Sequence, residues 1–159
     1  MRATEKHYRE LLELAPRYFA NAAGAFGEID RDATAAVLSA WMSSDESRVF
    51  VAENGAGKVI GVFMLGAGRV AFRPASVVVH GRTLWVAPEA RGAGVARQLM
   101  AEAESWAREI GAVAMMVGVP VDYSARRNAG DTSASGERAS LFYLRAGFAP
   151  ADASLLKVL

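Results

Sequence analysis

The chain has 159 residues, of which 52% are hydrophobic and 22% charged, and its formal net charge is +1. This composition fits one globular domain spanning residues 1–159, and the small net charge leaves no electrostatic footprint for nucleic acid or a membrane surface. Cysteine is absent and the histidines are His7 and His80, which excludes disulfides and thiolate catalysis and leaves no expected metal site. With no run of roughly 20 apolar residues and no basic leader, we expect a cytoplasmic protein.

The N-terminal part has the spacing of two helices. Thr4 can cap the first, whose apolar positions extend from Tyr8 to Ala22. Pro16 interrupts that pattern, so we expect either a kink or a break with Pro16 opening a second short helix. A turn rich in Gly and Ala follows at residues 21–27.

Asp30 or Asp32 can cap the next helix. Its predicted apolar face consists of Thr34, Val37, Leu38, Trp41 and Met42.

Strand patterns come next. Residues 48–53 and 59–65 are predicted strands, joined by a hairpin at Asn54-Gly-Ala-Gly57 in which Asn-Gly supplies positive φ angles. Pro74 separates them from a longer strand at 77–86. Gly81, inside that strand, indicates a bulge or a close approach of the backbone.

An amphipathic helix is predicted at 93–110 and a fully apolar strand at 113–119, of the kind found inside a parallel or mixed sheet. With strand 77–86 they form a βαβ unit with an expected right-handed crossover. Residues 120–136 are polar and rich in Gly and Ser, which is typical of either a functional rim or a disordered insertion.

A helix at 137–145 follows, with Gly147 at its C-terminal cap. Residues 155–159 form a predicted last short strand.

The turn at residues 91–96, Arg-Gly-Ala-Gly-Val-Ala, follows a strand and opens a helix. Such a turn can bind phosphate, because the first N–H groups of a helix have no partner and the helix dipole adds positive charge. From these residues alone, a glycine-rich turn that binds no ligand fits equally well. The Gly-Lys-Ser/Thr of a Walker A loop is missing. Arg97 stands where a dinucleotide fingerprint needs a third small residue.

Two segments together resemble the GCN5-related N-acetyltransferase (GNAT) superfamily. The turn is similar to its Arg/Gln-x-x-Gly-x-Gly/Ala motif, matched by Arg91, Gly94 and Ala96, and is preceded by a similar strand end at 84–89. Residues 139–148 resemble its Ala-x-x-x-Tyr-x-x-x-Gly-Phe element. The resemblance implies an α/β (α+β) fold with a mixed, mostly antiparallel sheet flanked by helices, in which the parallel strands 77–86 and 113–119 splay apart.

The resemblance also implies transfer of an acetyl group from acetyl-CoA to an amine. The acceptor is a small molecule or a peptide, with no nucleic acid or membrane partner and a possible homodimer. The alternatives are a non-catalytic acyl-CoA-binding module of the same fold and a phosphate or nucleotide binder. The implied cofactor-binding residues are Leu84, Val86, Arg91, Gly92, Ala93, Gly94, Val95, Ala96 and Tyr143.

Tyr143 matches the family's general acid, although a core tyrosine would also fit its helix. No carboxylate stands on strand 77–86, so His80 is the predicted base there, with Glu53, Asp122 or a chain of water molecules as alternatives. Gly136 stands where the family often has an asparagine that contacts the cofactor.

Overall fold

The computed structural model describes residues 1–19, 29–70, 73–118 and 134–150. They belong to two compact units, Met1–Gly118 and Val119–Leu159. The single domain spanning 1–159 therefore stays a prediction. The turn at 21–27, most of the segment 120–136, including Asp122, and the strand at 155–159 lie outside the described residues.

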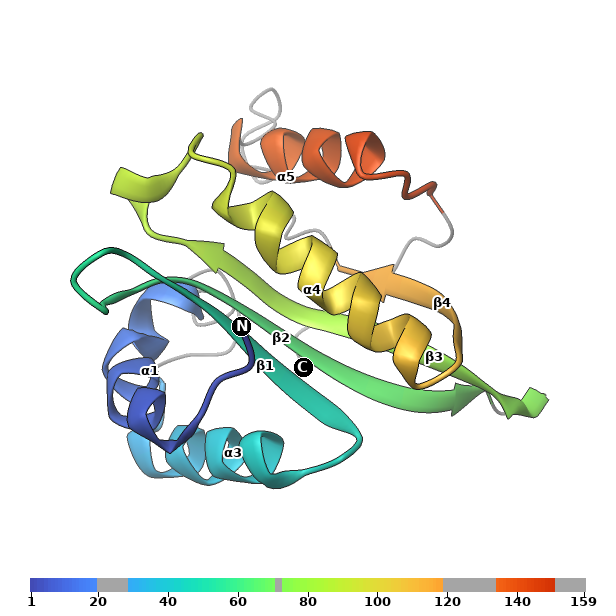
Figure 1. Ribbon diagram of the computed structural model, residues 1–159, viewed down its shortest axis with the longest axis horizontal. Coiled ribbons are helices and arrows are strands. Elements are labelled where there is room, and N and C mark those ends of the chain that lie inside the picture. The colour runs from blue at the N-terminus through green and yellow to red at the C-terminus, as the bar shows by residue number, and fades with distance from the viewer. Residues whose placement is uncertain (20–28, 71–72, 119–133, 151–159) are drawn as a thin grey trace, which may run out of the picture. The chain divides into compact units, whose positions relative to one another are not determined.

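The first unit contains a four-stranded sheet in the order β1 (Ser47–Glu53), β2 (Val59–Val70), β3 (Arg73–Val86) and β4 (Ala112–Val117) (Figure 1). The pairs β1/β2 and β2/β3 are antiparallel, whereas β3/β4 is parallel. The predicted mixed, mostly antiparallel sheet is confirmed.

Strands β2 and β3 are longer than predicted, and Pro74 lies inside β3 instead of separating two strands. Pro74 is the second residue of β3, beside the hairpin, where loss of one N–H donor removes little from the ladder. At the β1–β2 hairpin, the positive φ angle belongs to Gly57 (+75°) and not to the Asn54-Gly55 pair. The Asn54 side chain instead accepts hydrogen bonds from the N–H groups of Ala56 and Lys58.

Helix α1 (Glu5–Tyr18) begins after Thr4, as predicted. It does not break at Pro16 but continues to Tyr18, because a proline this close to the helix end removes a single intrahelical hydrogen bond. The N–H of Thr4 donates to Nδ1 of His7 at 2.8 Å. The other ring nitrogen of His7, Nε2, therefore donates to Oε1 of Glu53 at 3.1 Å and ties α1 to the end of β1.

Helix α3 (Arg31–Ser43) is capped by Asp30, whose carboxylate accepts from the N–H groups of Asp32 and Ala33. The predicted apolar face is only partly right. Leu38 is buried, but 53% of Val37 is exposed to solvent. Helical spacing gives the position of a stripe but not its width, so residues at its margin can face solvent.

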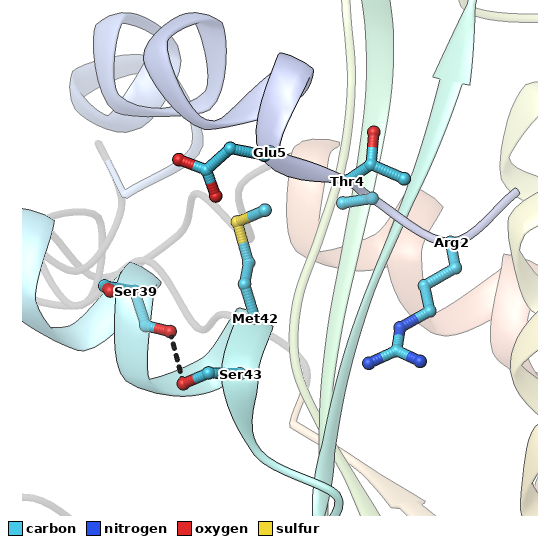
Figure 2. A pocket seen from close by; sticks show the side chains of 7 residues that line it. Arg2, Thr4, Glu5, Ser39, Met42 and Ser43 are labelled. Atoms are coloured by element: carbon cyan, nitrogen blue, oxygen red, sulfur yellow. Dashed lines mark hydrogen bonds between the residues drawn. The ribbon is translucent and has the colours of Figure 1, made fainter.

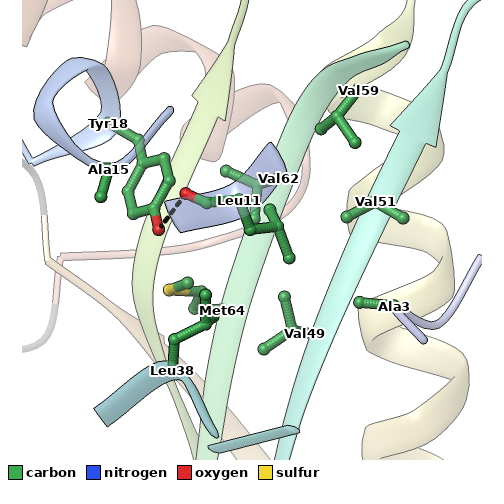
Figure 3. Close-up of a cluster of buried hydrophobic side chains, with 10 residues drawn as sticks. All are labelled: Ala3, Leu11, Ala15, Tyr18, Leu38, Val49, Val51, Val59, Val62 and Met64. Atoms are coloured by element: carbon green, nitrogen blue, oxygen red, sulfur yellow. Dashed lines mark hydrogen bonds between the residues drawn. The ribbon is translucent and has the colours of Figure 1, made fainter. Parts of the chain in front are cut away.

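Helices α1 and α3 pack on one face of the sheet (Figure 1). A buried cluster joins Leu11 of α1 and Leu38 of α3 to strand residues of β1 and β2 (Figure 3). Trp85 of β3 packs against this cluster. The cluster consists of Ala3, Leu11, Ala15, Tyr18, Leu38, Val49, Val51, Val59, Val62 and Met64.

Helix α4 (Val95–Glu109) packs on the opposite face. A methyl group on Gly61 of β2 would lie 2.8 Å from Cγ1 of Val95 and 3.0 Å from Cδ1 of Leu99. Because strand residues alternate between faces, Phe63 and Leu65, both fully buried, belong to this second core layer. Among the described helices, none is long and apolar enough to cross a membrane.

Strand β4 is paired in parallel with β3, as predicted, but not all of its apolar side chains are buried. Val113 is 67% exposed and Met116 is 42% exposed. β4 is the last strand of the sheet in the described part of the chain, so an apolar run alone did not distinguish an inner strand from an outer one.

Both predictions for Gly81 are confirmed. The register between β2 and β3 shifts beside it, since Gly81 pairs with Leu65 while Thr83 pairs with Met64, and Arg82 is the extra residue. A Cβ at Gly81 would lie 2.9 Å from Cγ1 of Val117.

We therefore expect Gly81→Ala to lower the free energy of unfolding by about 1–3 kcal/mol, through overpacking against Val117 and the Phe63 ring. Gly68→Ala on β2 is the matched control, because its added methyl meets its nearest atoms only at 3.9 Å. Urea denaturation of both variants measures the difference. An equal loss in the two variants would contradict the close approach at Gly81.

Candidate functional site

The turn before α4 has the geometry of an anion cradle. Gly92 and Gly94 both have φ angles of +84°, which residues with a side chain rarely adopt. Both glycines are exposed, and a Cβ on either would meet no protein atom within 4 Å. The chain therefore turns sharply here and leaves open space in front of its backbone.

The N-terminus of α4 has free hydrogen-bond donors. Gly94 is the N-cap residue, so no side chain caps the helix. Within the described residues, no acceptor faces the N–H groups of Gly92, Val95 or Ala96, whereas the N–H of Ala93 meets the carbonyl of Ala90 at 3.4 Å. Free N–H groups at the positive end of a helix dipole are the donors that a phosphate requires.

Arg91 holds the turn against the end of β3. Its Nε donates to the carbonyl oxygen of Val86 at 3.1 Å, and the side chain is otherwise exposed. Arg91 therefore links the turn to the end of β3, and it carries a positive charge on the residue that directly precedes Gly92.

The end of β3 presents backbone groups on its outer edge. The N–H of Ala87 donates to the carbonyl of Ile60 on β2 at 2.9 Å. Backbone groups alternate in direction along a strand, so those of Leu84 and Val86 point away from β2. The bond from Arg91 to the Val86 carbonyl agrees with this direction.

The parallel pairing that covers this edge ends early. It extends from Val77, paired with Ala112, to Gly81, paired with Val117. Within the described residues, the part of β3 from Arg82 to Val86 has no partner in β4. Among the described residues, β3 and β4 thus share an edge only from Val77 to Gly81, below the bulge.

His80 lies just below this opening, on the α1/α3 face of the sheet. It pairs with Gly66, and its ring lies next to Gly68. It is half-buried, and the structure gives it no hydrogen-bond partner among the described residues. His80 is six residues from Val86, roughly 20 Å along the strand, so it belongs to the opening and not to the phosphate turn.

The geometry does not favour Glu53 as a base. Its Oε1 accepts from Nζ of Lys6 at 3.0 Å and from Nε2 of His7 at 3.1 Å. The Lys6 hydrogen bond is the largest cause that holds the pKa of Glu53 below its ordinary value; burial opposes it and His7 adds to it. This carboxylate joins α1 to β1.

Tyr143 lies on helix α5 (Ala134–Arg145), in the second unit. This helix begins earlier than predicted, inside the segment expected to be a loop. Tyr143 is 8% exposed, and burial raises the pKa of its hydroxyl to about 12. Its ring packs edge-on against Phe142 and Phe148, with centroids 5.3 and 5.5 Å away.

The spacing of Tyr143, Gly147 and Phe148 has a structural explanation. Gly147 has φ +91°. Its N–H donates to the Leu144 carbonyl at 3.1 Å, and the N–H of Phe148 donates to the Tyr143 carbonyl at 3.0 Å. These two bonds and the Tyr143–Phe148 contact define a Schellman helix end, so this segment fixes the Tyr143 side chain whatever its chemical role.

A groove elsewhere in the first unit holds none of the predicted site residues. It has a volume of about 400 Å³ and lies between the N-terminal segment and α3, with Arg2 and Glu5 on one side and Met42 on the other (Figure 2). The described residues contain no group of three or more His, Cys, Asp or Glu side chains that could hold a metal ion.

Fold and site define an α/β protein in which one strand of a parallel pair leads to an uncapped, glycine-containing helix N-terminus. The model of the acetyltransferase (GNAT) domain matches residues 45–150. The chain belongs to the GNAT acetyltransferase family, and the resemblance found in the sequence is confirmed. A search of curated protein sequences found no match.

Solved structures show the same fold at low sequence identity. A probable acetyltransferase has 24% identity and a TM-score of 0.72, with 100% of this chain and 95% of that chain covered. The aminoglycoside N-acetyltransferase AAC(6')-Iy, in complex with a CoA bisubstrate analogue, has 21% identity, a TM-score of 0.74 and the same coverage. A transcriptional regulator from Bacillus halodurans C-125 has 17% identity and a TM-score of 0.74, with 100% and 97% covered.

Proposed function

We propose that the protein transfers an acetyl group from acetyl-CoA to an amine. The observation that carries the proposal is the continuity of two sets of backbone groups that have no partner among the described residues. They are the groups of Leu84 and the N–H of Val86 on the outer edge of β3, where the Val86 carbonyl already accepts from Arg91, and the N–H groups of Gly92, Val95 and Ala96 on the α4 turn. An extended chain with amide groups and a pyrophosphate at one end complements both sets.

In this arrangement, the pyrophosphate of acetyl-CoA accepts hydrogen bonds from the turn, with Arg91 beside it. The pantetheine amides pair with Leu84 and Val86 as an added strand would. The thioester end then lies further back along β3, near Thr83 and the bulge at Arg82. AAC(6')-Iy, which has this fold, was solved with CoA, and this supports an acyl-CoA as donor.

The reaction is direct attack of the amine nitrogen on the thioester carbonyl. A C–N bond forms, the C–S bond breaks, and CoA leaves as a thiolate that needs one proton, while the nitrogen loses one. An amine that is protonated in water must also lose a proton before it attacks. His80 is the proposed base on β3, and it has no competing partner among the described residues.

We propose Tyr143 as the hydrogen-bond donor to the leaving sulfur, on the resemblance of residues 139–148. A hydroxyl with a pKa of about 12 stays protonated throughout the neutral range. Full transfer of its proton to a thiolate, whose conjugate acid has a pKa of about 8.5, is uphill by roughly 5 kcal/mol. Tyr143 therefore acts mainly by stabilising charge that develops on sulfur.

Acetyl-CoA should raise the melting temperature, and Gly92→Asp should weaken its binding at least tenfold, because a carboxylate then faces the pyrophosphate. Gly57→Asp is the matched control: Gly57 also has a positive φ and open space around it, but lies in the β1–β2 hairpin. Calorimetric titration measures both affinities. No thermal shift at millimolar acetyl-CoA, or equal weakening by both variants, would contradict the proposed site.

Tyr143→Phe should lower kcat about 10- to 100-fold, with the Kd for acetyl-CoA unchanged, because the ring contacts remain and only the hydroxyl is lost. Since the neutral hydroxyl is the active form, its contribution persists until the pH approaches 12, and any titration of the rate below pH 10 belongs to another group. Thiol release against pH measures this for both proteins.

Unchanged kcat in Tyr143→Phe would remove this residue from the reaction. Binding of acetyl-CoA without thiol release for any amine would favour the alternative of a non-catalytic acyl-CoA-binding module.

A further inference from the structure

The strands that border the opening carry charge of one sign. β2, β3 and β4 contain no aspartate or glutamate, whereas they contain Arg69, Arg73, His80 and Arg82. On β1 the only carboxylate is that of Glu53, which already accepts hydrogen bonds from Lys6 and His7. No described carboxylate of the sheet is therefore free to attract a cation.

Arg82 is the member of this group that stands at the opening. It is the extra residue of the β3 bulge, immediately after Gly81, where pairing with β4 ends. Its side chain is exposed, and among the described residues it forms neither a hydrogen bond nor an ion pair. Arg69 differs, because its guanidinium donates to the carbonyl of Pro74 at 2.8 Å.

Arg82 is not part of the phosphate turn. It lies four positions before Val86, which corresponds to roughly 13 Å along the strand. The proposed thioester lies at this same level of β3. The Arg82 guanidinium is exposed and has no partner among the described residues, and the planar fork of a guanidinium is suited to hold an oxyanion through two hydrogen bonds.

We infer that Arg82 selects an acceptor whose amine is accompanied by a carboxylate or phosphate group, as in amino acids, and that it disfavours polycationic amines. The inference rests on the proposed function, because it places the acceptor at the thioester. The bulge contributes to this selection, because it takes Arg82 out of the regular alternation of side chains between the two faces of β3. It also places Arg82 next to Gly81, the last residue of β3 that is paired with β4.

The test compares amines that differ only in the oxyanion: amino acids against their decarboxylated amines, O-phosphoethanolamine against ethanolamine, and spermidine as polycation. We expect kcat/KM for the best oxyanion-bearing acceptor to exceed that of its partner at least tenfold. Arg82→Gln should reduce this ratio about 10- to 100-fold, and Arg82→Lys should recover part of it, because an ammonium keeps the charge but not the fork. The Kd for acetyl-CoA should stay unchanged.

Arg73→Gln is the matched control, since Arg73 is exposed on the same strand but at its other end. An equal loss of the ratio in Arg73→Gln, an unchanged ratio in Arg82→Gln, or a preference for spermidine would overturn the inference while thiol release still supported acetyl transfer. Absence of both a thermal shift with acetyl-CoA and thiol release would overturn the proposed function, and the inference with it.

Discussion

The arrangement of this protein depends on where the pairing of two parallel strands stops. Among the described residues, β3 and β4 are paired up to Gly81 and Val117, and beyond this point β3 continues to Val86 without a described partner on that edge. Gly81, the last paired residue of β3, has no room for a side chain, because an added Cβ would lie 2.9 Å from Val117 and 3.0 Å from Phe63. Backbone N–H and C=O groups that are half-buried and unpaired are costly, so a strand edge of this kind favours a ligand that supplies the missing partners.

The turn after β3 also has backbone N–H groups without hydrogen-bond acceptors among the described residues. Helix α4 begins at a glycine and therefore has no side-chain cap, and its first N–H groups point into open space. Arg91 links the two features, since its side chain donates to the carbonyl of the last residue of β3 and the residue directly precedes Gly92 of the turn. The outer edge of β3, Arg91 and the N-terminus of α4 follow one another along the chain. Together they complement a ligand that has amide groups along its length and negative charge at one end. The acceptor is recognised elsewhere, by the exposed charge at the bulge.

Much of the architecture was predictable because it depends on short-range rules. The caps at Thr4 and Asp30, the bulge beside Gly81 and the uncapped turn at residues 91–96 all follow from local chemistry. What the sequence did not predict depends on neighbours distant in the chain. The exposure of Val113 on β4 and of Val37 on α3 is set by which elements cover them, and periodicity carries no information on that. The sequence showed only that strand 77–86 lacks a carboxylate, because the exposed and unpaired state of Arg82 becomes evident from the fold.

The central claim is that acetyl-CoA supplies partners to the outer edge of β3 and to the turn. Amide hydrogen exchange, resolved by residue and measured with and without acetyl-CoA, tests it directly. The account predicts slower exchange at Leu84 and Val86 together with Gly92, Val95 and Ala96, and little change at Ala87, whose N–H already donates to Ile60. Unchanged exchange at Leu84 and Val86 in the saturated protein would contradict it.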